Sequence, residues 1–280
     1  MDASKVSPIG FPCRMTPTPN FNGFEWVVVN SSGGKDSQVA LARTVGVAEE
    51  QGFPLNRVVV SHQDLGRMEW AGTKELVFEQ AAHYGLRVEV TQYRNKDGET
   101  PDLLDYVRKR GMWPSNSQRY CTSDFKRGPG GRVLTKLARE SSGDILQVFG
   151  FRAQESPARS KKNPYTLNRR ASTKSREVWD WLPIHELTEE QVWKKIREEG
   201  VRHHPAYDLG MPRLSCVFCI FAPRDALLTA GIANPELLQE YVDLEEEIDH
   251  TFQNGKSLRD IQKAIEAGEL PTGCSGEWNM

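Results

Sequence analysis

Apolar and polar positions follow one another along the chain in the order that a strand-and-helix repeat produces. Short apolar runs rich in β-branched residues, typical of buried strands, are followed by stretches of about a dozen residues with helical spacing. The predicted strands span residues 24–30, 57–62, 86–91 and 144–150. The predicted helices span residues 36–51, 73–84, 102–110 and 132–141, with a loop over 113–131. This order predicts an α/β fold with a doubly wound, mostly parallel sheet of the Rossmann-like kind.

Several helices are predicted in the last hundred residues. Thr188 is followed three residues later by Gln191, the spacing of a capping box, so a helix is expected from there to about residue 199. Further helices are predicted over 224–230, 235–252 and 258–267, as a cap packed on the sheet. The expected organisation is an irregular, proline-rich arm over 1–23, a main domain over 24–200 and a helical C-terminal region over 201–280.

Composition narrows the class of protein. The chain has 280 residues, 38% of them hydrophobic, and a formal net charge of −2, which argues against a uniformly basic nucleic-acid binder. No apolar run approaches the roughly 18–20 residues of a membrane span, and the N-terminal arm lacks the apolar core of a signal peptide. The protein is therefore expected to be cytoplasmic, without a membrane partner, and its five cysteines to be reduced.

The strongest local signal lies directly after the first strand. The segment reads Ser31-Ser32-Gly33-Gly34-Lys35-Asp36-Ser37 and leads into a helix. The glycines let the backbone approach an anion, the helix start presents a positive dipole, Lys35 adds a charge, and Ser32 and Ser37 add hydroxyl donors. The spacing differs from that of the P-loop, in which the two glycines stand five residues apart. We expect this loop to bind phosphate.

Two other loops start at the same edge of the predicted sheet, over residues 63–69 and 151–159. Asp64 is placed to accept from a ribose hydroxyl or to help hold Mg²⁺, with a turn or cap residue as the alternative. Asp36, inside the phosphate loop, is the better Mg²⁺ candidate.

Residues 152–176 form the most basic stretch. It has eight basic residues and one acidic residue, a net charge of +7. Such runs are often solvated loops. Because this one follows a strand's carboxyl end, Arg152 and Arg159 are candidates to bind phosphate, and the other cations are candidates to contact a nucleic-acid backbone.

The cysteines suggest a metal or redox site. Cys216 and Cys219 form a C-x-x-C, which fits half of a zinc knuckle, a redox pair, part of an iron–sulfur site or two buried thiols. Cys121 lies in a separate element and Cys274 in a glycine-flanked tail. Cys13, in the proline-rich arm, is read as incidental.

Several of these motifs resemble known families. Ser-Gly-Gly-Lys-Asp-Ser resembles the pyrophosphate loop of the adenine nucleotide α-hydrolase (PP-loop) superfamily, whose members cleave ATP between the α- and β-phosphates. Residues 150–159 resemble the Gly-x-Arg-x-x-Glu-Ser-x-x-Arg element of the phosphoadenylylsulfate (PAPS) reductase-like group. The Pro-Ile-x-x-x-Thr-x-x-x-Val-Trp pattern of residues 183–193 and the segment 204–210 also recur there, so the resemblance covers residues 27–221.

The same resemblance implies a cofactor. Residues 121–129 are similar to the Cys-Thr-x-x-x-Lys-x-x-Pro element that provides cluster ligands in iron–sulfur members. It implies a 4Fe-4S cluster held by Cys121, Cys216 and Cys219, with Cys274 or a non-protein group as fourth ligand. Assimilatory reductases have two adjacent cysteines in this element and this chain has one. Zinc, with a histidine such as His203 or His204, is the alternative.

Among these proteins, the combination is most similar to the ATP pyrophosphatase of bacterial DNA phosphorothioation systems. That likeness implies ATP and Mg²⁺ as cofactors, DNA as substrate, and a cysteine desulfurase with other sulfur-modification proteins as partners. Lys35 and the loop would hold the β,γ-phosphates, Asp36 the Mg²⁺, and Arg152 and Arg159 the α-phosphate or the substrate phosphate. The alternatives are a PAPS/APS reductase-type enzyme, a tRNA thiolation enzyme, and an ATP-binding defence or regulatory protein without turnover.

Overall fold

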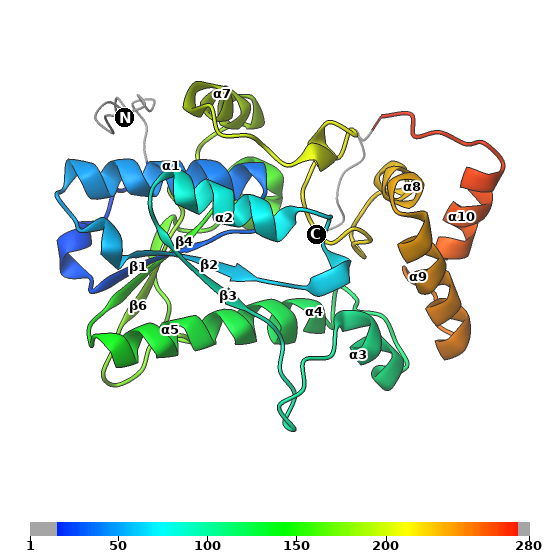
Figure 1. Ribbon diagram of the computed structural model, residues 1–280, viewed down its shortest axis with the longest axis horizontal. Helices are drawn as coiled ribbons and strands as arrows, with labels where there is room; N and C mark the ends of the chain where they lie inside the picture. Colours follow the sequence, from blue (N-terminus) through cyan, green and yellow to red (C-terminus); the bar gives the residue numbers. More distant parts are fainter. Residues whose placement is uncertain (1–15, 274–280) are drawn as a thin grey trace. The chain divides into compact units, whose positions relative to one another are not determined.

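Six strands form one sheet in the computed structural model, which describes residues 16–273 (Figure 1). They are β1 (Trp26–Asn30), β2 (Val58–Gln63), β3 (Arg87–Thr91), β4 (Ile145–Phe149), β5 (Tyr165–Leu167) and β6 (Val178–Trp181). Their order is β3-β2-β1-β4-β6-β5. β1 runs parallel to β2 and β4, β4 runs parallel to β6, and β5 is an antiparallel edge strand. The predicted doubly wound, mostly parallel sheet is confirmed, and the order reverses between β1 and β4.

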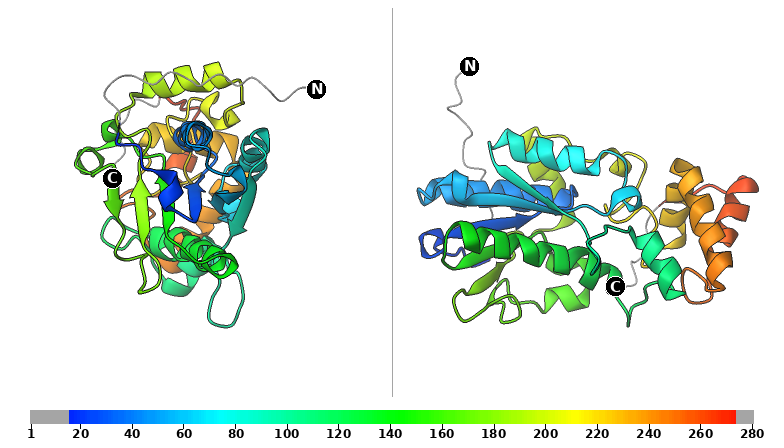
Figure 2. Two further views of the ribbon diagram at one scale, coloured as in Figure 1. Left: turned by 90° about the vertical axis from the view of Figure 1, so that its left-hand side faces the viewer. Right: turned by 60° about the horizontal axis from the view of Figure 1, so that its bottom comes forward.

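Helices cover both faces of this sheet (Figures 1 and 2). The helices in the described part of the chain are α1 (Lys35–Glu50), α2 (Thr73–His83), α3 (Leu103–Arg110), α4 (Tyr120–Thr122), α5 (Gly128–Glu140), α6 (Pro157–Ser160), α7 (Glu189–Glu199), α8 (Arg224–Ala233), α9 (Pro235–Ile248) and α10 (Leu258–Glu266). Those that share a core with the strands are α1, α2 and α7 in one cluster and α5 in the other. Val27 and Val29 of β1 pack into the same core as α1, whereas Val28 packs with α5. Successive side chains of a strand point to opposite faces, so an unbroken run of buried valines is what a sheet covered on both sides requires.

The capping box predicted for α7 is confirmed. The Thr188 side chain accepts from the Gln191 N–H, and the Gln191 side chain accepts from the Thr188 N–H. The C-cap, Gly200, has a φ of 72°, a left-handed conformation that glycine adopts without steric cost. Both ends of the helix are therefore set by local sequence.

The loop predicted over residues 113–131 is partly wrong. From Tyr120 the chain is helical, through α4, a π-helical stretch η4 (Ser123–Arg127) and α5. The glycines and proline at the start of α5 suggested a loop. Pro129 is the second residue of α5, directly after the π-helical stretch, so the helical chain accommodates a residue without a backbone N–H at this junction. The strands β5 and β6 were not predicted either.

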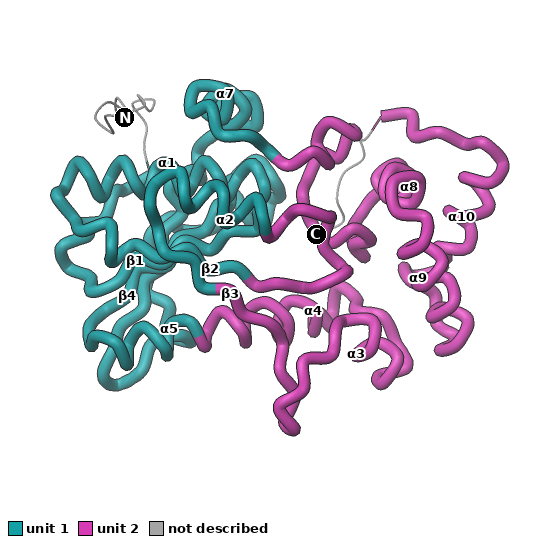
Figure 3. The backbone as a smooth tube through the Cα atoms, viewed as in Figure 1, with its two compact units in different colours: residues 1–62, 75–89, 133–203 teal, residues 63–74, 90–132, 204–280 magenta. Residues whose placement is uncertain are grey.

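By its internal contacts the chain divides into two compact units (Figure 3). Unit 1 comprises the described residues up to 62, with 75–89 and 133–203; unit 2 comprises 63–74, 90–132 and the described residues from 204. Residues 16–23 of the predicted arm pack on unit 1: Phe21 is fully buried against Phe53 and Trp181, and Trp181 Nε1 donates to the Pro17 carbonyl at 3.0 Å. The expected segments 1–23, 24–200 and 201–280 remain a prediction about domains.

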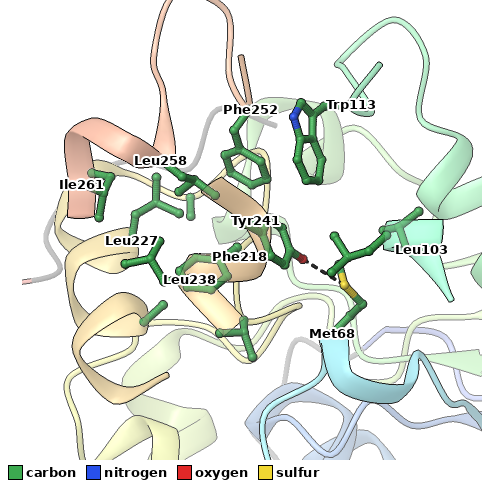
Figure 4. Packing of buried hydrophobic residues seen from close by; sticks show 14 of the residues in the cluster. Met68, Leu103, Trp113, Phe218, Leu227, Leu238, Tyr241, Phe252, Leu258 and Ile261 are labelled. Carbon is green, nitrogen blue, oxygen red and sulfur yellow. Dashed lines mark hydrogen bonds between the residues drawn. The ribbon is translucent and has the colours of Figure 1, made fainter. Parts of the chain in front are cut away.

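Unit 2 has an apolar core of its own (Figure 4). The fully buried Tyr241 of α9 stacks on Trp113 with ring centroids 5.2 Å apart, and its hydroxyl lies 3.0 Å from the Met68 sulfur. The buried carboxylate of Glu245 accepts from Ser257 Oγ and the Leu258 N–H, which fixes the start of α10. No residue of this core in the described part of the chain lies in a strand. The expectation that α8, α9 and α10 pack on the sheet remains a prediction. Among the described residues, no helix is long and apolar enough to cross a membrane.

Glu199, at the end of α7, carries a buried carboxyl whose two oxygens have no hydrogen-bond partner in the described part of the chain. Burial raises the pKa of Glu199 from 4.5 to about 7. Between those values the unfolded chain loses a proton that the folded chain keeps, so stability falls as pH rises through this window.

We therefore expect Glu199→Gln to stabilise the protein by about 1–3 kcal/mol at pH 8 and to have little effect below pH 4.5. Denaturant unfolding at several pH values measures this, with Glu190→Gln, an exposed carboxylate of the same helix, as the control. A gain that is the same at every pH would contradict the assignment.

Candidate functional site

The loop between β1 and α1 is shaped by its own glycines and serines. Gly33 has a φ of 70°, which a residue with a Cβ adopts only with strain, and Gly34 is the N-cap of α1. Ser37 Oγ donates to the Gly34 carbonyl at 2.8 Å and accepts from the Ser32 N–H at 3.3 Å. The Ser31 hydroxyl accepts from the Gly33 N–H at 3.2 Å. This leaves the positive end of a 16-residue helix beside a tight turn, the arrangement that binds phosphate.

The loop is held against the end of β4 at an unusually close approach. A Cβ added to Gly150 would lie 2.6 Å from the Asp36 carbonyl oxygen and 2.8 Å from the Ser37 nitrogen. No side chain fits there, because both atoms belong to the backbone at the start of α1. Gly150 thus brings the segment that follows β4 directly to the phosphate loop.

Lys35 and Asp36 are held by charged partners from two other segments. The Lys35 side chain is 1% exposed, and its ammonium lies 3.3 Å from Glu189 Oε1 and 4.0 Å from Asp36 Oδ2. The second carboxylate oxygen of Asp36 accepts from the buried Arg152 at 2.5 Å. Three of the four residues predicted to be catalytic therefore meet in unit 1.

A glutamine joins the two segments. Arg152 Nη1 donates to Gln154 Oε1 at 2.9 Å, and the same oxygen accepts from the backbone N–H of Glu189 at 2.8 Å. Sequence reasoning missed both Gln154 and Glu189. Glu189 stands directly after the N-cap Thr188, at a position that neither the capping box nor the Pro-Ile-x-x-x-Thr-x-x-x-Val-Trp pattern specifies.

The electrostatics of Asp36 reflect its surroundings. Burial raises the pKa of the Asp36 carboxyl, and the positive charges of Arg152 and Lys35 oppose that shift. A further cation at this site would favour the ionised carboxylate more strongly, so a divalent ion is a natural partner for it.

The fourth predicted residue, Arg159, lies slightly apart from the loop. Its guanidinium pairs with Glu155 and lies 4.3 Å from the centre of the Phe151 ring. Glu155 also accepts from the Arg152 N–H at 2.8 Å, so one carboxylate links the two arginine positions. The Arg159 carbonyl accepts from His185 Nε2 at 2.9 Å, which fixes the short helix α6.

Asp64 belongs to unit 2. Its carboxylate accepts from the Gly66 N–H at 2.8 Å and pairs with Lys74 at 3.1 Å. The first of these bonds is that of an Asx turn, the alternative reading of this residue. A role with ribose or Mg²⁺ remains a prediction.

The basic stretch of residues 152–176 divides into two groups. Arg152 and Arg159 are held as described, and Arg176 donates to the Leu134 carbonyl at 2.8 Å. The other five basic side chains are exposed, before and after the edge strand β5: Lys161, Lys162, Arg169, Arg170 and Lys174.

The described cysteines lie in unit 2, close enough to Lys126 to shift its pKa. The backbone of Cys216 forms an antiparallel bridge with Glu69, and Cys121 lies in α4, just before the π-helical stretch. Negative charge on Cys216, and less strongly on Cys219 and Cys121, raises the pKa of the Lys126 ammonium. Lys126 is the lysine of the Cys-Thr-x-x-x-Lys-x-x-Pro element, but no role was predicted for it, and its side chain is exposed to solvent.

The three thiols are suitable ligands for a metal ion or cluster, but they are not already arranged as a binding site. All three are free and partly exposed. Burial of the thiol groups raises the pKa values of Cys216 and Cys219. Within residues 16–273, no three His, Cys, Asp or Glu side chains are arranged so as to hold a metal ion. Cys274 and Cys13 lie outside the described residues.

The histidines named for zinc have other contacts. His204 is buried, its Nδ1 accepts from the Ala206 N–H at 3.1 Å, and its Nε2 lies 3.3 Å from Thr73 Oγ1. The ring of His203 packs edge-on against Trp193 in unit 1. Neither arrangement favours zinc over a site built from thiolates.

The glycine loop lies between the first strand and the first helix of a doubly wound sheet, and Arg152, which follows β4, contacts it. This arrangement is that of a nucleotide-binding α/β protein. The chain belongs to the phosphoadenosine phosphosulfate reductase domain family, whose model matches residues 26–222. The predicted membership of the PAPS reductase-like group is thereby confirmed.

Similar proteins include adenosine 5′-phosphosulfate (APS) reductases. The chain is 28% identical over 160 residues to that of Allochromatium vinosum, which covers 56% of each chain, and 26% identical over 139 residues to that of Staphylococcus epidermidis. It is 27% identical over 155 residues to an uncharacterized 37.8 kDa protein of Escherichia phage 186, covering 55% of this chain and 46% of the phage protein. The chain spans about half the length of the curated relatives it matches.

Among solved structures, a phosphate complex of PAPS reductase from Candida auris is 19% identical. It superposes with a TM-score of 0.46, over 71% of this chain and 82% of that one.

The contact at Gly150 yields a stability prediction. Gly150→Ala should destabilise the protein by about 2–4 kcal/mol, because the start of α1 must move away from β4. Gly131→Ala is the matched control: a Cβ there meets nothing within 4 Å inside helix α5, so the protein should gain up to about 1 kcal/mol. Denaturant unfolding measures both, and a Gly150→Ala protein as stable as wild type would refute the close packing.

Proposed function

We propose that this protein is an ATP pyrophosphatase, which cleaves ATP to AMP and pyrophosphate and so activates a substrate for sulfur incorporation. One observation carries the proposal: Lys35 and Asp36 stand at the start of α1 beside a glycine turn, and Arg152 reaches them from β4. A phosphate loop that lacks a lysine would suit a substrate that is already activated, such as an activated sulfate, because no leaving-group charge has to be stabilised there. An ammonium beside the loop can also stabilise the negative charge that develops on a pyrophosphate leaving group.

In this proposal the residues divide the triphosphate between them. The loop and Lys35 bind the β- and γ-phosphates, and Asp36 would hold Mg²⁺, which when bound would neutralise part of their negative charge. Arg152 and Arg159 neutralise the α-phosphate as an oxygen of the acceptor attacks it and pyrophosphate leaves. The acceptor then carries AMP, which departs when sulfur replaces the attacking oxygen. Asp36 and Arg152 are already paired and buried, so little reorganisation of this part is needed when the ligand binds.

The cysteine group is proposed to serve the sulfur half of the reaction. Cys121, Cys216 and Cys219, with Cys274 as fourth ligand, would hold a 4Fe-4S cluster, which when bound would supply sulfur or electrons for the transfer. Thiols with raised pKa values bind metal only as they lose their protons, and the Lys126 cation is placed to stabilise the resulting negative charge.

The sulfur acceptor is proposed to be a DNA backbone phosphate. The five exposed cations near β5 support this by giving a nearly neutral chain a local basic region. A cysteine desulfurase and other sulfur-modification proteins would deliver the sulfur and help to bind the DNA. The second candidate is an APS reductase-type activity, favoured by the relatives from A. vinosum and S. epidermidis. Thiolation of tRNA and ATP binding without turnover are the remaining alternatives.

Product analysis tests the reaction. Anaerobically purified protein is incubated with Mg²⁺ and ATP labelled at the α-phosphate, alone and with DNA, tRNA or a cysteine desulfurase. AMP with pyrophosphate is the expected result, and ADP would contradict it. Reduction of APS in a parallel reaction, with no AMP from ATP, would favour the reductase candidate.

Lys35→Ala should lower the rate of pyrophosphate release by at least about 100-fold, because the charge on the leaving group loses its stabilising cation. Lys194→Ala is the control, since that exposed lysine of α7 has only a 3.9 Å ion pair with Glu198. Equal rates in Lys35→Ala and wild type would reject the role of the loop.

Cys216→Ser should abolish a broad absorbance near roughly 400 nm and the bound iron of anaerobically purified protein. Cys13→Ser, at the cysteine read as incidental, should retain both. A colourless wild-type protein that contains zinc would contradict the cluster.

A further inference from the structure

The ammonium of Lys35 is already engaged before any ligand arrives. Its partner is Glu189, the first residue of α7, whose carboxylate lies 3.3 Å from the ammonium. Trp193, four residues further along α7, has its ring centre 6.0 Å from the same ammonium. Residues four apart lie on one face of a helix, so α7 presents an acid and an aromatic ring to the phosphate-loop lysine.

The charges around the loop are balanced. Among the residues that the structure describes, three cations, Lys35, Arg152 and Arg159, form ion pairs with three carboxylates, Asp36, Glu155 and Glu189. A polyphosphate that approaches these six groups meets cations whose charge is already offset by the carboxylates. Binding therefore requires that one of the carboxylates be neutralised or leave.

Of the three carboxylates, Glu189 is the one free to leave. Its side chain is 47% exposed, against 19% for Asp36 and 7% for Glu155. Its backbone is fixed, because its N–H donates to Gln154 and the capping box holds the helix start. The side chain can therefore rotate into solvent while α7 stays in place.

Glu189 compensates a charge that the fold buries. Exposed ion pairs add little stability, whereas a buried ammonium without a counter-ion is costly. Glu189 supplies the counter-ion that the buried ammonium requires, and water solvates its carboxylate when the side chain moves away from Lys35. This is what an internal substitute for a phosphate requires.

We propose that the Glu189 carboxylate occupies the position of a phosphate group at Lys35 and that a polyphosphate must displace it in order to bind. This rests on the proposed function of the loop. The exchange lowers the apparent affinity for every anion, because only the fraction of molecules with Glu189 displaced can bind. It selects for pyrophosphate-containing ligands, whose several charges and contacts offset the lost ion pair, over inorganic phosphate.

Calorimetric titration with inorganic pyrophosphate tests this, first in EDTA and then with Mg²⁺. Glu189→Gln should bind pyrophosphate about tenfold more tightly than wild type in EDTA, because the competing charge is gone. Glu190→Gln, the next residue and also exposed, should stay within about twofold. Glu189→Asp, which keeps the charge on a shorter side chain, provides a second variant if the glutamine protein does not fold, and it should also bind more tightly than wild type.

The outcomes separate this inference from the proposed function. Equal affinities of wild type and Glu189→Gln would overturn the inference and leave the phosphate loop intact. Weaker binding by Glu189→Gln would show that Glu189 assists the ligand and would also overturn it. If neither protein binds pyrophosphate or ATP, the proposed function fails and the inference fails with it.

Discussion

The arrangement of the phosphate loop depends on a single buried charge, the ammonium of Lys35. A cation that is 1% exposed must be compensated by nearby negative groups, and Asp36 and Glu189 provide them from two different helices. Asp36 in turn requires Arg152, which comes from the end of β4. The partners of one ammonium therefore tie together α1, α7 and the central strands of the sheet.

The path of the backbone brings Arg152 within reach of Asp36. Arg152 reaches Asp36 only because β4 and the start of α1 come together at Gly150, where a Cβ would overlap the backbone. Parallel pairing of β1 with β4 places the two strand ends side by side, with Asn30 opposite Phe149. The switch in strand order thus supplies the place where a loop and an arginine can meet, as in other doubly wound sheets.

The cysteines and Lys126 of unit 2 differ from the phosphate loop in that their cation is exposed and not buried. In unit 2 the three described cysteines interact electrostatically with Lys126, which is exposed, so water and the neighbouring sulfurs both contribute to its environment. The π-helical stretch between Cys121 and α5 widens the helix where this lysine lies, a distortion that is frequent at functional sites. The family match extends over both groups, from residue 26 to residue 222, although it assigns neither a metal nor a substrate to this chain.

The sequence by itself determined the elements whose signals are local. The valine runs of β1 and β2, the capping box at Thr188 and the glycine loop before α1 each depend on neighbouring residues, and each was predicted correctly. The helix start at Tyr120 and the strands β5 and β6 were missed, because glycines and proline masked the first and the strands are only three and four residues long.

Tertiary structure alone decided which charges meet. Gln154 and Glu189 lie 35 residues apart, and Lys35 and Glu189 lie much further apart, so no spacing in the sequence connects them. Lys126 is part of a sequence motif with Cys121, but only the structure brings Cys216 and Cys219 close enough to affect its pKa. Propensity and periodicity act over a few residues, whereas the partner of a buried charge is chosen by the packing of distant segments.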